Sequence, residues 1–341
     1  MRIFQVIFWP FGFVYGLIML VRNKLFDWNL LSVSKVDLPV ISVGNLSVGG
    51  TGKTPHVDYI VSYLKEKLSV AILLRGYGRK SRGYILLDEN TTIETVGDEA
   101  LFYKKKHEKQ VEVVVCEKRA EGAKKIVSQL PSVDVVVLDD AFQHRYLHRD
   151  IDILLVDYNN PYWKDTTLPA GRLREFSVGK KRANIIVITK SPDDLSLEEK
   201  QQLTSKVNPT SNQYVFFSKI KYGAVKSLTN NKFKTPDKIL LVTGIAQPEP
   251  LKKYFERIAP VEHLNFNDHH DFSIADIKKI HELFDTFVDE EKIIITTAKD
   301  YMRLSCLDLK KEIDKYPWFY QDIKVEMDDE KKFKELIDKI C

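Results

Sequence analysis

The stretch VISVGNLSVGGTGKTP, residues 40–55, decides the fold of this chain. An apolar strand at 40–43 runs into a glycine-rich loop, and Gly52, Lys53 and Thr54 open an amphipathic helix. This is the arrangement of a nucleotide phosphate-binding loop, in which backbone N–H groups and a helix N-terminus surround phosphate oxygens. In such loops the lysine binds the β- and γ-phosphates and the hydroxyl ligates Mg²⁺. The stretch therefore predicts a nucleoside triphosphate and magnesium as ligands.

The predicted nucleotide-binding residues belong to the loop and the first helical turn: Ser47, Val48, Gly49, Gly50, Thr51, Gly52, Lys53 and Thr54. The loop is a variant, because the first glycine of the G-x-x-x-x-G-K-[ST] pattern falls on Ser47. Gly44, Gly49 and Gly50 supply backbone flexibility at other offsets. The alternative is a chance glycine-rich turn, and the flanking strand and helix argue against it.

A second acidic element lies in VDVVVLDDAFQHR, residues 133–145. Asp139 and Asp140 stand at the carboxyl end of a buried strand, where open α/β sheets bind ligands. A carboxylate there can hold the Mg²⁺ shell as a Walker B aspartate does. Adjacent acids at a strand end are also common as solvated caps, so the phosphate loop is what favours the functional interpretation. We predict Thr54, Asp139 and Asp140 as magnesium ligands.

Short apolar runs alternate with helical patterns from residue 40 onward. The runs rich in Val and Ile are predicted strands: 40–43, 70–74, 84–87, 111–116, 133–139, 152–157 and 183–189. Because they mostly lack polar alternation, they are typical of strands buried on both faces of a parallel sheet. The pattern predicts an α/β fold with a P-loop, doubly wound, mostly parallel sheet. A second, smaller α/β unit follows, with strands at 239–244, 261–266 and 292–298 and a helix near 275–287.

Between these units, β-branched and aromatic residues surround Gly223, and we interpret residues 213–229 as a two-stranded linker. The predicted organisation thus has four parts, namely an apolar N-terminal segment (1–28), a P-loop domain (29–212), the linker, and a smaller C-terminal α/β domain (230–341).

The composition is that of an ordinary folded protein, with 341 residues, 44% hydrophobic and 29% charged. Lys and Arg number 52 against 48 Asp and Glu, a net charge of +4. A dedicated nucleic-acid binder usually concentrates more positive charge, so no nucleic-acid partner is predicted. The cysteines at 116, 306 and 341 are too widely spaced for a disulfide framework or a zinc site, which fits a reducing compartment.

The N-terminus carries an uncharged stretch, residues 3–21 (IFQVIFWPFGFVYGLIMLV). As a helix it would span roughly 28 Å, close to the hydrocarbon thickness of a bilayer. Pro10, Gly12 and Gly16 argue against an undisturbed spanning helix, and the tryptophans suit an interfacial position. We predict membrane association; spanning and interfacial placements both stay open, and a buried core helix is the alternative.

Seven motifs occur in an order that resembles one known family. They are VGNLSVGGTGKTP (43–55), RGYGRKSRGY (75–84), VGDEALF (96–102), LDDAFQHR (138–145), LPAGRLRE (168–175), NDHHDF (267–272) and TAKD (297–300). Together they resemble the tetraacyldisaccharide 4′-kinases, the lipid A 4′-kinases of Gram-negative envelope synthesis. One departure is Arg172, where many members of the family carry proline.

The resemblance implies that the chain transfers the γ-phosphate of ATP, with Mg²⁺, to the 4′-hydroxyl of a tetraacylated diglucosamine 1-phosphate, a step in lipopolysaccharide biosynthesis. It implies an enzyme at the cytoplasmic face of the inner membrane, whose partners are the lipid A disaccharide precursor and the membrane surface. No protein partner is implied. The apolar N-terminus agrees with this expectation, because a substrate with four acyl chains stays in the bilayer.

The resemblance also implies catalytic roles. Asp98 matches the position of a catalytic base, although an Asp after Gly97 is by chemistry more often a helix N-cap. His269 matches a histidine that supports this base, and His270 is a competing candidate. Lys53 completes the predicted catalytic set.

Five further residues are candidate substrate or phosphate contacts: Arg75, Arg79, Arg119, Gln143 and His144. Arg75 and Arg79 lie in one basic loop after a strand, which is either an anion site or an ordinary solvated turn. Arg119 is either a phosphate contact or a surface helix residue.

Two other functions fit the phosphate loop. A membrane-associated P-loop switch or metal-insertion NTPase shares the variant loop and the strand-end aspartates, but needs no second α/β domain with an Asp-His-His. A soluble small-molecule kinase would use the N-terminal helix as core. Dependence of ATP turnover on a lipid acceptor separates the lipid kinase from the switch.

Overall fold

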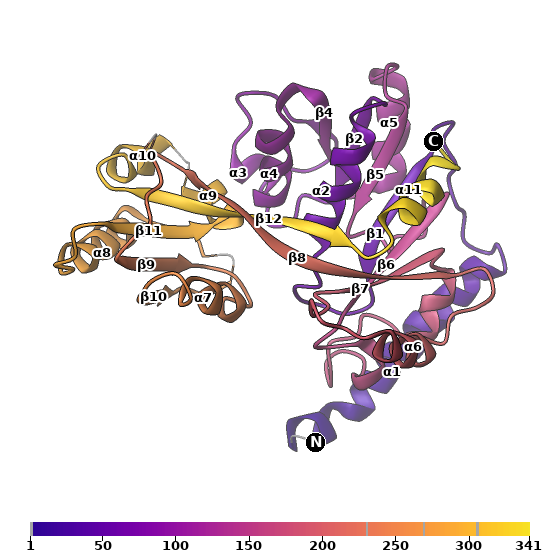
Figure 1. Cartoon of the computed structure of the whole chain (residues 1–341). Helices are drawn as coiled ribbons and strands as arrows, with labels where there is room; N and C mark the ends of the chain where they lie inside the picture. Colours follow the sequence, from indigo (N-terminus) through magenta and orange to yellow (C-terminus); the bar gives the residue numbers. More distant parts are fainter. Residues whose placement is uncertain (1–2, 230, 269, 305–306) are drawn as a thin grey trace. The chain divides into compact units, whose positions relative to one another are not determined.

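The structure is a computed structural model that describes residues 3–229, 231–268, 270–304 and 307–341 (Figure 1). The described chain forms two compact units. Unit 1 comprises Met1–Ile220 and Val325–Cys341, and unit 2 comprises Lys221–Lys324.

The sheet of unit 1 is built around β1, which lies between β5 and β6 and pairs with both in parallel. Its strands follow the order β8-β7-β6-β1-β5-β2-β4-β3, and β3 alone pairs antiparallel with its neighbour. The strand bounds are β1 Val40–Asn45, β2 Val70–Leu74, β3 Ile85–Leu86, β4 Val111–Val115, β5 Val135–Asp139, β6 Ile151–Asp157, β7 Ile185–Thr189 and β8 Tyr214–Ser227. The predicted mostly parallel α/β fold is confirmed.

Helices cover both faces of this sheet, which explains why its strands read as continuous apolar runs. Their bounds are α1 Ile3–Asp27, α2 Lys53–Leu64, α3 Ile93–Val96, α4 Asp98–His107, α5 Arg119–Gln129, α6 Leu197–Val207 and α11 Glu330–Asp338. On one face Ala123 and Ile126 of α5 pack on Val136 and Leu138 of β5. In α2 the predicted apolar positions 57, 60, 61 and 64 are all buried.

Unit 2 has its own parallel sheet in the order β10-β9-β11-β12. Its strands are β9 Lys238–Thr243, β10 Val261–Asn265, β11 Lys292–Thr297 and β12 Trp318–Met327, and its helices are α7 Glu249–Phe255, α8 Ile274–Asp285, α9 Ala298–Leu304 and α10 Leu307–Ile313. Alternate residues of β9 face two cores, since Leu240 packs with α8 and Leu241 packs with α7. The predicted second, smaller α/β unit is confirmed.

Residues 213–229 contain one strand and not two. Strand β8 is continuous over Tyr214–Ser227. Its two neighbours in the sheet are β7 and β12, and β12 begins about 100 residues further along the chain. Gly223 makes no turn: its φ is not positive, and a Cβ there would lie 3.5 Å from the Asp322 carbonyl oxygen. Residues 325–341, placed by the sequence in the smaller domain, lie in unit 1. That residues 213–229 serve as a linker between domains stays a prediction.

Helix α1 is continuous through Pro10, Gly12 and Gly16. Among the described helices it alone, over Gln5–Asp27, is long and apolar enough to cross a membrane by length and composition. Large apolar side chains point away from the protein along its length, among them Ile7, Phe11, Val14 and Ile18.

Candidate active site

The phosphate loop connects β1 to α2 and has an open face. Gly49 and Gly52 have φ of 106° and 86°, a region that favours glycine. A Cβ built on Gly49 or Gly50 meets nothing within 4 Å, so these backbone amides can be reached by a ligand. Gly44 has another role, because a Cβ there would lie 2.7 Å from the Cβ of Phe142. It allows close packing and does not supply loop flexibility.

Side chains from neighbouring strands hold the loop from behind. Asn45 Nδ2 donates to Thr51 Oγ1 (2.8 Å), and Thr189 Oγ1 donates to the Thr51 carbonyl (2.9 Å). Lys190 Nζ donates to the Gly50 carbonyl and to Asp157 Oδ2, the latter at 2.8 Å. These bonds turn the Gly50 and Thr51 carbonyls toward the protein. The Val48 and Thr51 amides donate to the Arg172 and Gly49 carbonyls, so an anion would use the glycine amides of the loop.

His56 fastens the junction between the loop and α2. Its Nδ1 lies 2.6 Å from the Gly52 carbonyl and its Nε2 lies 2.7 Å from Ser218 Oγ. Since a carbonyl only accepts, Nδ1 carries the proton and Nε2 accepts from the serine hydroxyl. Burial lowers the pKa of His56 to about 4. The residue is therefore a neutral clamp at neutral pH.

This pKa predicts a pH-dependent stability. Because the unfolded imidazole titrates near 6.5, the unfolded state binds the extra proton first, and stability present above that pH is lost as pH falls toward 4. At pH 5 the expected loss from His56 is about 2 kcal/mol relative to pH 7. Urea unfolding at both pH values should show a smaller pH difference in His56→Gln than in wild type. An equal difference would mean that His56 is not buried and neutral.

Lys53 and Asp140 face each other at the head of α2. Lys53 Nζ lies 3.5 Å from Asp140 Oδ2, and Arg174 donates two bonds to the same carboxylate, at 2.7 and 3.0 Å. Burial raises the pKa of Asp140, but Lys53 and Arg174 outweigh it and leave that pKa below its ordinary value. Asp140 is thus a charged carboxylate shared by two cations.

Asp139 is buried, 3% exposed, and has an unused acceptor. Tyr103 of α4 donates to its Oδ2 at 2.9 Å and lies 3.3 Å from the Thr54 carbonyl, so Thr54 and Asp139 are neighbours. Its Oδ1 has no hydrogen-bond partner among the described residues. Burial, with the charges of Glu99 and Asp140, raises the pKa of Asp139. An unpaired buried oxygen of this kind is suited to a cation.

No group of three or more His, Cys, Asp or Glu within the described ranges forms a metal cage of its own. Mg²⁺ is commonly held by one or two carboxylates together with substrate phosphates. Thr54, Asp139 and Asp140 fit that mode, with Asp139 the best placed of the two acids because Asp140 is already engaged.

Three of the predicted substrate residues gather beside these aspartates. Arg119, 3% exposed at the start of α5, has a buried Nε with no partner in the described chain, and burial lowers its pKa to about 10 while Asp140 opposes that shift. His144 Nε2 has no partner among the residues that the structure describes, and burial, followed by Arg119 and other arginines including Arg75, lowers the pKa of His144 to about 4. Arg75 and Arg119 thus form a cationic cluster next to the phosphate loop, with His144 beside them as a neutral imidazole at neutral pH.

The other two predicted substrate residues, Arg79 and Gln143, make hydrogen bonds to other groups of the protein. Arg79 pairs with Glu117 and donates to the Gly83 carbonyl at 2.7 Å, which closes its own loop. Gln143 Nε2 donates to the Asn45 carbonyl (2.9 Å) and to Glu175 Oε1 (3.0 Å). These contacts describe structural roles for both side chains.

Asp98 is the first residue of α4, and Gly97 takes the N-cap position. Gly97 has φ of 88°, and a Cβ there would lie 2.5 Å from the Tyr77 carbonyl. Asp98 Oδ1 accepts from the Glu99 amide at 2.9 Å. His269 lies outside the described residues. His270, in unit 2, has Nε2 3.1 Å from Asp276 Oδ2 and stacks on Phe266, so its ring is engaged within that unit.

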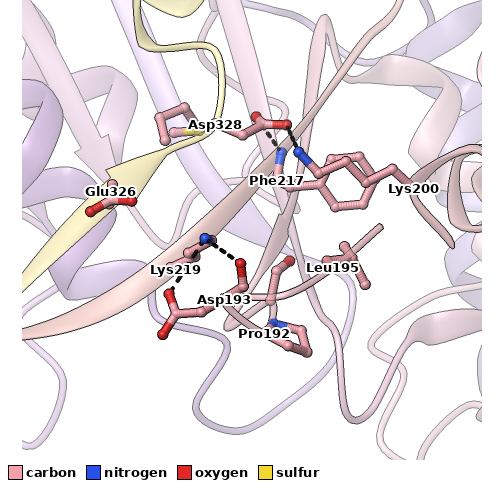
Figure 2. A pocket seen from close by; sticks show the side chains of 10 residues that line it. Pro192, Asp193, Leu195, Lys200, Phe217, Lys219, Glu326 and Asp328 are labelled. Atoms are coloured by element: carbon pink, nitrogen blue, oxygen red, sulfur yellow. Dashed lines mark hydrogen bonds and ion pairs between the residues drawn. The ribbon is translucent and has the colours of Figure 1, made fainter. Parts of the chain in front are cut away.

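A separate pocket of about 260 Å³ lies in unit 1 between the 191–195 segment, α6 and the ends of β8 and β12. Figure 2 shows its ion pairs, Lys200 with Asp328 and Lys219 with Asp193. None of the predicted site residues lines it.

Several residues of the site were not predicted: Asn45, His56, Tyr103, Arg174 and Lys190. One of them had a detectable signal. His56 lies one helical turn before Ile60, on the apolar face of α2, so its burial follows from the helical period. Asn45 binds Thr51 only six residues away, and the other three depend on how distant segments meet.

The fold and this site together define a P-loop protein that binds a nucleoside triphosphate at the carboxyl edge of a parallel sheet. The family model described as tetraacyldisaccharide-1-P 4′-kinase matches residues 4–341. A tetraacyldisaccharide 4′-kinase of Bacteroides thetaiotaomicron is 43% identical over 315 residues, covering 87% of this chain and 82% of the relative. One of Flavobacterium johnsoniae is 42% identical, covering 89% and 88%.

Among solved structures, the crystal structure of LpxK from Aquifex aeolicus in complex with ATP superposes with a TM-score of 0.76 at 31% identity, covering 98% of this chain and 99% of that one. The chain belongs to the tetraacyldisaccharide 4′-kinase family. The resemblance drawn from the seven motifs is confirmed.

Proposed function

We propose that this protein transfers the γ-phosphoryl group of ATP to the 4′-hydroxyl of a tetraacyldisaccharide 1-phosphate, the lipid A precursor. The observation that carries the proposal is the meeting of an open phosphate loop with unpartnered buried polar atoms on Asp139, Arg119 and His144. Family membership supplies the acceptor class.

In the reaction, the bond between the γ-phosphorus and the β,γ-bridging oxygen breaks, a bond to the 4′-oxygen forms, and ADP leaves. Lys53 and the loop amides hold the β- and γ-phosphates. Thr54 and Asp139, with Asp140 nearby, would hold Mg²⁺, which supplies neutralisation of the phosphate charge. The 4′-hydroxyl proton passes to a base, and we assign Asp98 to that role with His269 as its support.

The cationic cluster of Arg75 and Arg119, with the neutral His144 imidazole beside it, serves the anionic groups of ATP or of the sugar phosphate. Guanidinium groups match phosphate oxygens in pairs. An unpartnered donor such as Arg119 Nε costs free energy when buried, and a bound phosphate would remove that cost.

The place of action is the cytoplasmic face of the inner membrane. Helix α1 supports this proposal because its outward face is apolar: Ile7, Phe11 and Ile18 are 60%, 64% and 61% exposed. Exposed apolar stretches of this kind mark membrane or protein contacts.

Asp139→Ala should lower kcat and raise the Mg²⁺ concentration needed for half-maximal rate, because it removes the carboxylate with the free oxygen. We expect a loss on the order of 10²-fold at limiting Mg²⁺, as for loss of one pre-organised electrostatic group. Magnesium titrations of wild type, Asp139→Ala and the control Asp328→Ala, an acid that Lys200 holds away from the phosphate loop, check it. An unaltered magnesium requirement in Asp139→Ala would exclude Asp139 as a ligand.

The acceptor dependence of turnover tests the function itself. ADP release should be slow without the lipid acceptor and rise when tetraacyldisaccharide 1-phosphate is added in mixed micelles. Steady hydrolysis that ignores the acceptor would instead favour a P-loop switch or metal-insertion NTPase.

A further inference from the structure

The face of helix α1 that packs against the protein carries few large apolar side chains. Its buried residues are Gly12, Gly16, Asn23 and Phe26, which lie on one side of a helix because their spacings of 4, 7 and 3 match its period. The large apolar side chains point the other way. Among the buried positions that the structure describes in this helix, Phe26 is the only large apolar side chain. Polar side chains add to the contact, because Arg22 donates to the Gln143 carbonyl and Asp27 pairs with Arg145.

The two glycines rest on residues 165–176, the segment that contains the LPAGRLRE motif. Thr167 Oγ1 donates to the Gly12 carbonyl. A Cβ on Gly12 would lie 2.7 Å from the Thr167 carbonyl oxygen, and one on Gly16 would lie 2.5 Å from the ring of Phe176. Only glycine permits this approach, so the helix and the segment are closely fitted.

The same segment is hydrogen-bonded to the phosphate loop on its other side. The Val48 amide donates to the Arg172 carbonyl (2.8 Å), and the Arg174 amide donates to the Leu46 carbonyl (2.7 Å). Ser47 and Leu173 form the antiparallel bridge between them. The side chain of Arg174 then reaches Asp140, so the path of this segment determines where that carboxylate is held.

Glu175 joins the helix to the loop a second time. This carboxylate is 1% exposed and accepts from Asn23 Nδ2 of α1 at 2.6 Å, from Gln143 Nε2 at 3.0 Å and from both terminal nitrogens of Arg182. Gln143 in turn donates to the Asn45 carbonyl at the end of β1. Three side chains from separate parts of unit 1 thus meet at the buried Glu175 carboxylate.

We propose that helix α1 is a positioning element of the phosphate-binding site in addition to a membrane-contacting surface. Gly12, Gly16 and Asn23 hold segment 165–176 in place, and that segment sets Arg174, Asp140 and the entry to the phosphate loop. The inference rests on the proposed nucleotide site, but not on the identity of the lipid acceptor. Substitutions that weaken the contact between α1 and segment 165–176 should weaken ATP binding even where no membrane is present.

The test compares two kinds of substitution in the same helix. Gly12→Ala and Asn23→Ala disturb the contact between α1 and segment 165–176. Val14→Ala and Ile18→Ala change side chains that are 54% and 61% exposed. Affinity for a fluorescent ATP analogue is measured in detergent with Mg²⁺ and no lipid acceptor, and membrane affinity by co-sedimentation with anionic phospholipid vesicles. We expect Gly12→Ala and Asn23→Ala to lose ATP affinity on the order of tenfold and to retain vesicle binding. A tenfold loss is the effect of one hydrogen bond to a buried charge. Val14→Ala and Ile18→Ala should lose vesicle binding and retain ATP affinity.

A rescue variant separates positioning from general damage. Gly16→Ala should lose ATP affinity because its methyl group meets the Phe176 ring, and adding Phe176→Ala should restore it. If Gly12→Ala fails to fold, Asn23→Ala decides, since it only removes an amide. Wild-type ATP affinity in a folded Asn23→Ala protein, or no recovery in the double variant, would overturn the proposal. Because no acceptor is present, a failure of the lipid-kinase assignment would leave these results unchanged.

Discussion

Lys53→Ala should lower kcat for phosphoryl transfer by on the order of 10²–10³, the usual loss when one pre-organised group leaves a charged transition state. Lys53 is the cation at the head of α2, and its Nζ faces Asp140 at 3.5 Å. The variant also leaves Asp140 with one fewer positive partner. Initial rates with saturating acceptor, over a range of ATP and Mg²⁺, measure the effect.

Thr54 supplies the matched comparison, because the two side chains are adjacent but serve different atoms. Thr54→Ala removes a predicted Mg²⁺ ligand, whereas Thr54→Ser keeps the hydroxyl and should stay close to wild type. Raising Mg²⁺ should partly restore Thr54→Ala and should not restore Lys53→Ala. Equal restoration of both variants, or of neither, would show that the loop is misassigned.

Asp98→Ala should lower kcat by on the order of 10²–10⁴, the range for loss of a general base. The KM for ATP should change little, because a base contacts the acceptor hydroxyl and not the nucleotide. Measuring kcat at several pH values in wild type, Asp98→Ala and Asp98→Asn checks the assignment, since Asn keeps the shape of the side chain but cannot accept the proton.

Substitution of His269 provides a second test of the same assignment. His269→Ala should cost less than Asp98→Ala, and the double variant should resemble Asp98→Ala alone, because residues that act as a unit are not additive. Losses that multiply would show that the two residues act independently. If Asp98→Ala mainly raises the KM for ATP–Mg²⁺, Asp98 belongs to the nucleotide site and the base lies elsewhere.

The core of each unit was predictable because buried parallel strands need apolar side chains on both faces. Runs such as VAILL at 70–74 and KIIITTA at 292–298 therefore show directly in the sequence, and the structure places strands there. Strand β12 was not predicted, because charged residues such as Asp322 and Lys324 interrupt its apolar pattern. Its position follows from pairing with distant strands, which local periodicity does not record.

The phosphate loop was predictable because all its parts lie within sixteen consecutive residues. Arg174 was not, since its contact with Asp140 depends on the path by which segment 165–176 returns to β1. The glycines of α1 were interpreted as interruptions of a membrane helix. In the structure they are contact points, because an approach of 2.7 Å between a would-be Cβ of Gly12 and a carbonyl oxygen is a tertiary property.

Transfer of label from ATP to a lipid shows directly whether this chain is a lipid kinase. Enzyme is mixed with γ-labelled ATP, Mg²⁺ and tetraacyldisaccharide 1-phosphate in mixed micelles, and lipids are separated by thin-layer chromatography. We expect label in a lipid more polar than the acceptor, formed by wild type and nearly absent with Lys53→Ala. Label that appears only as inorganic phosphate, at a rate independent of the lipid, would contradict it.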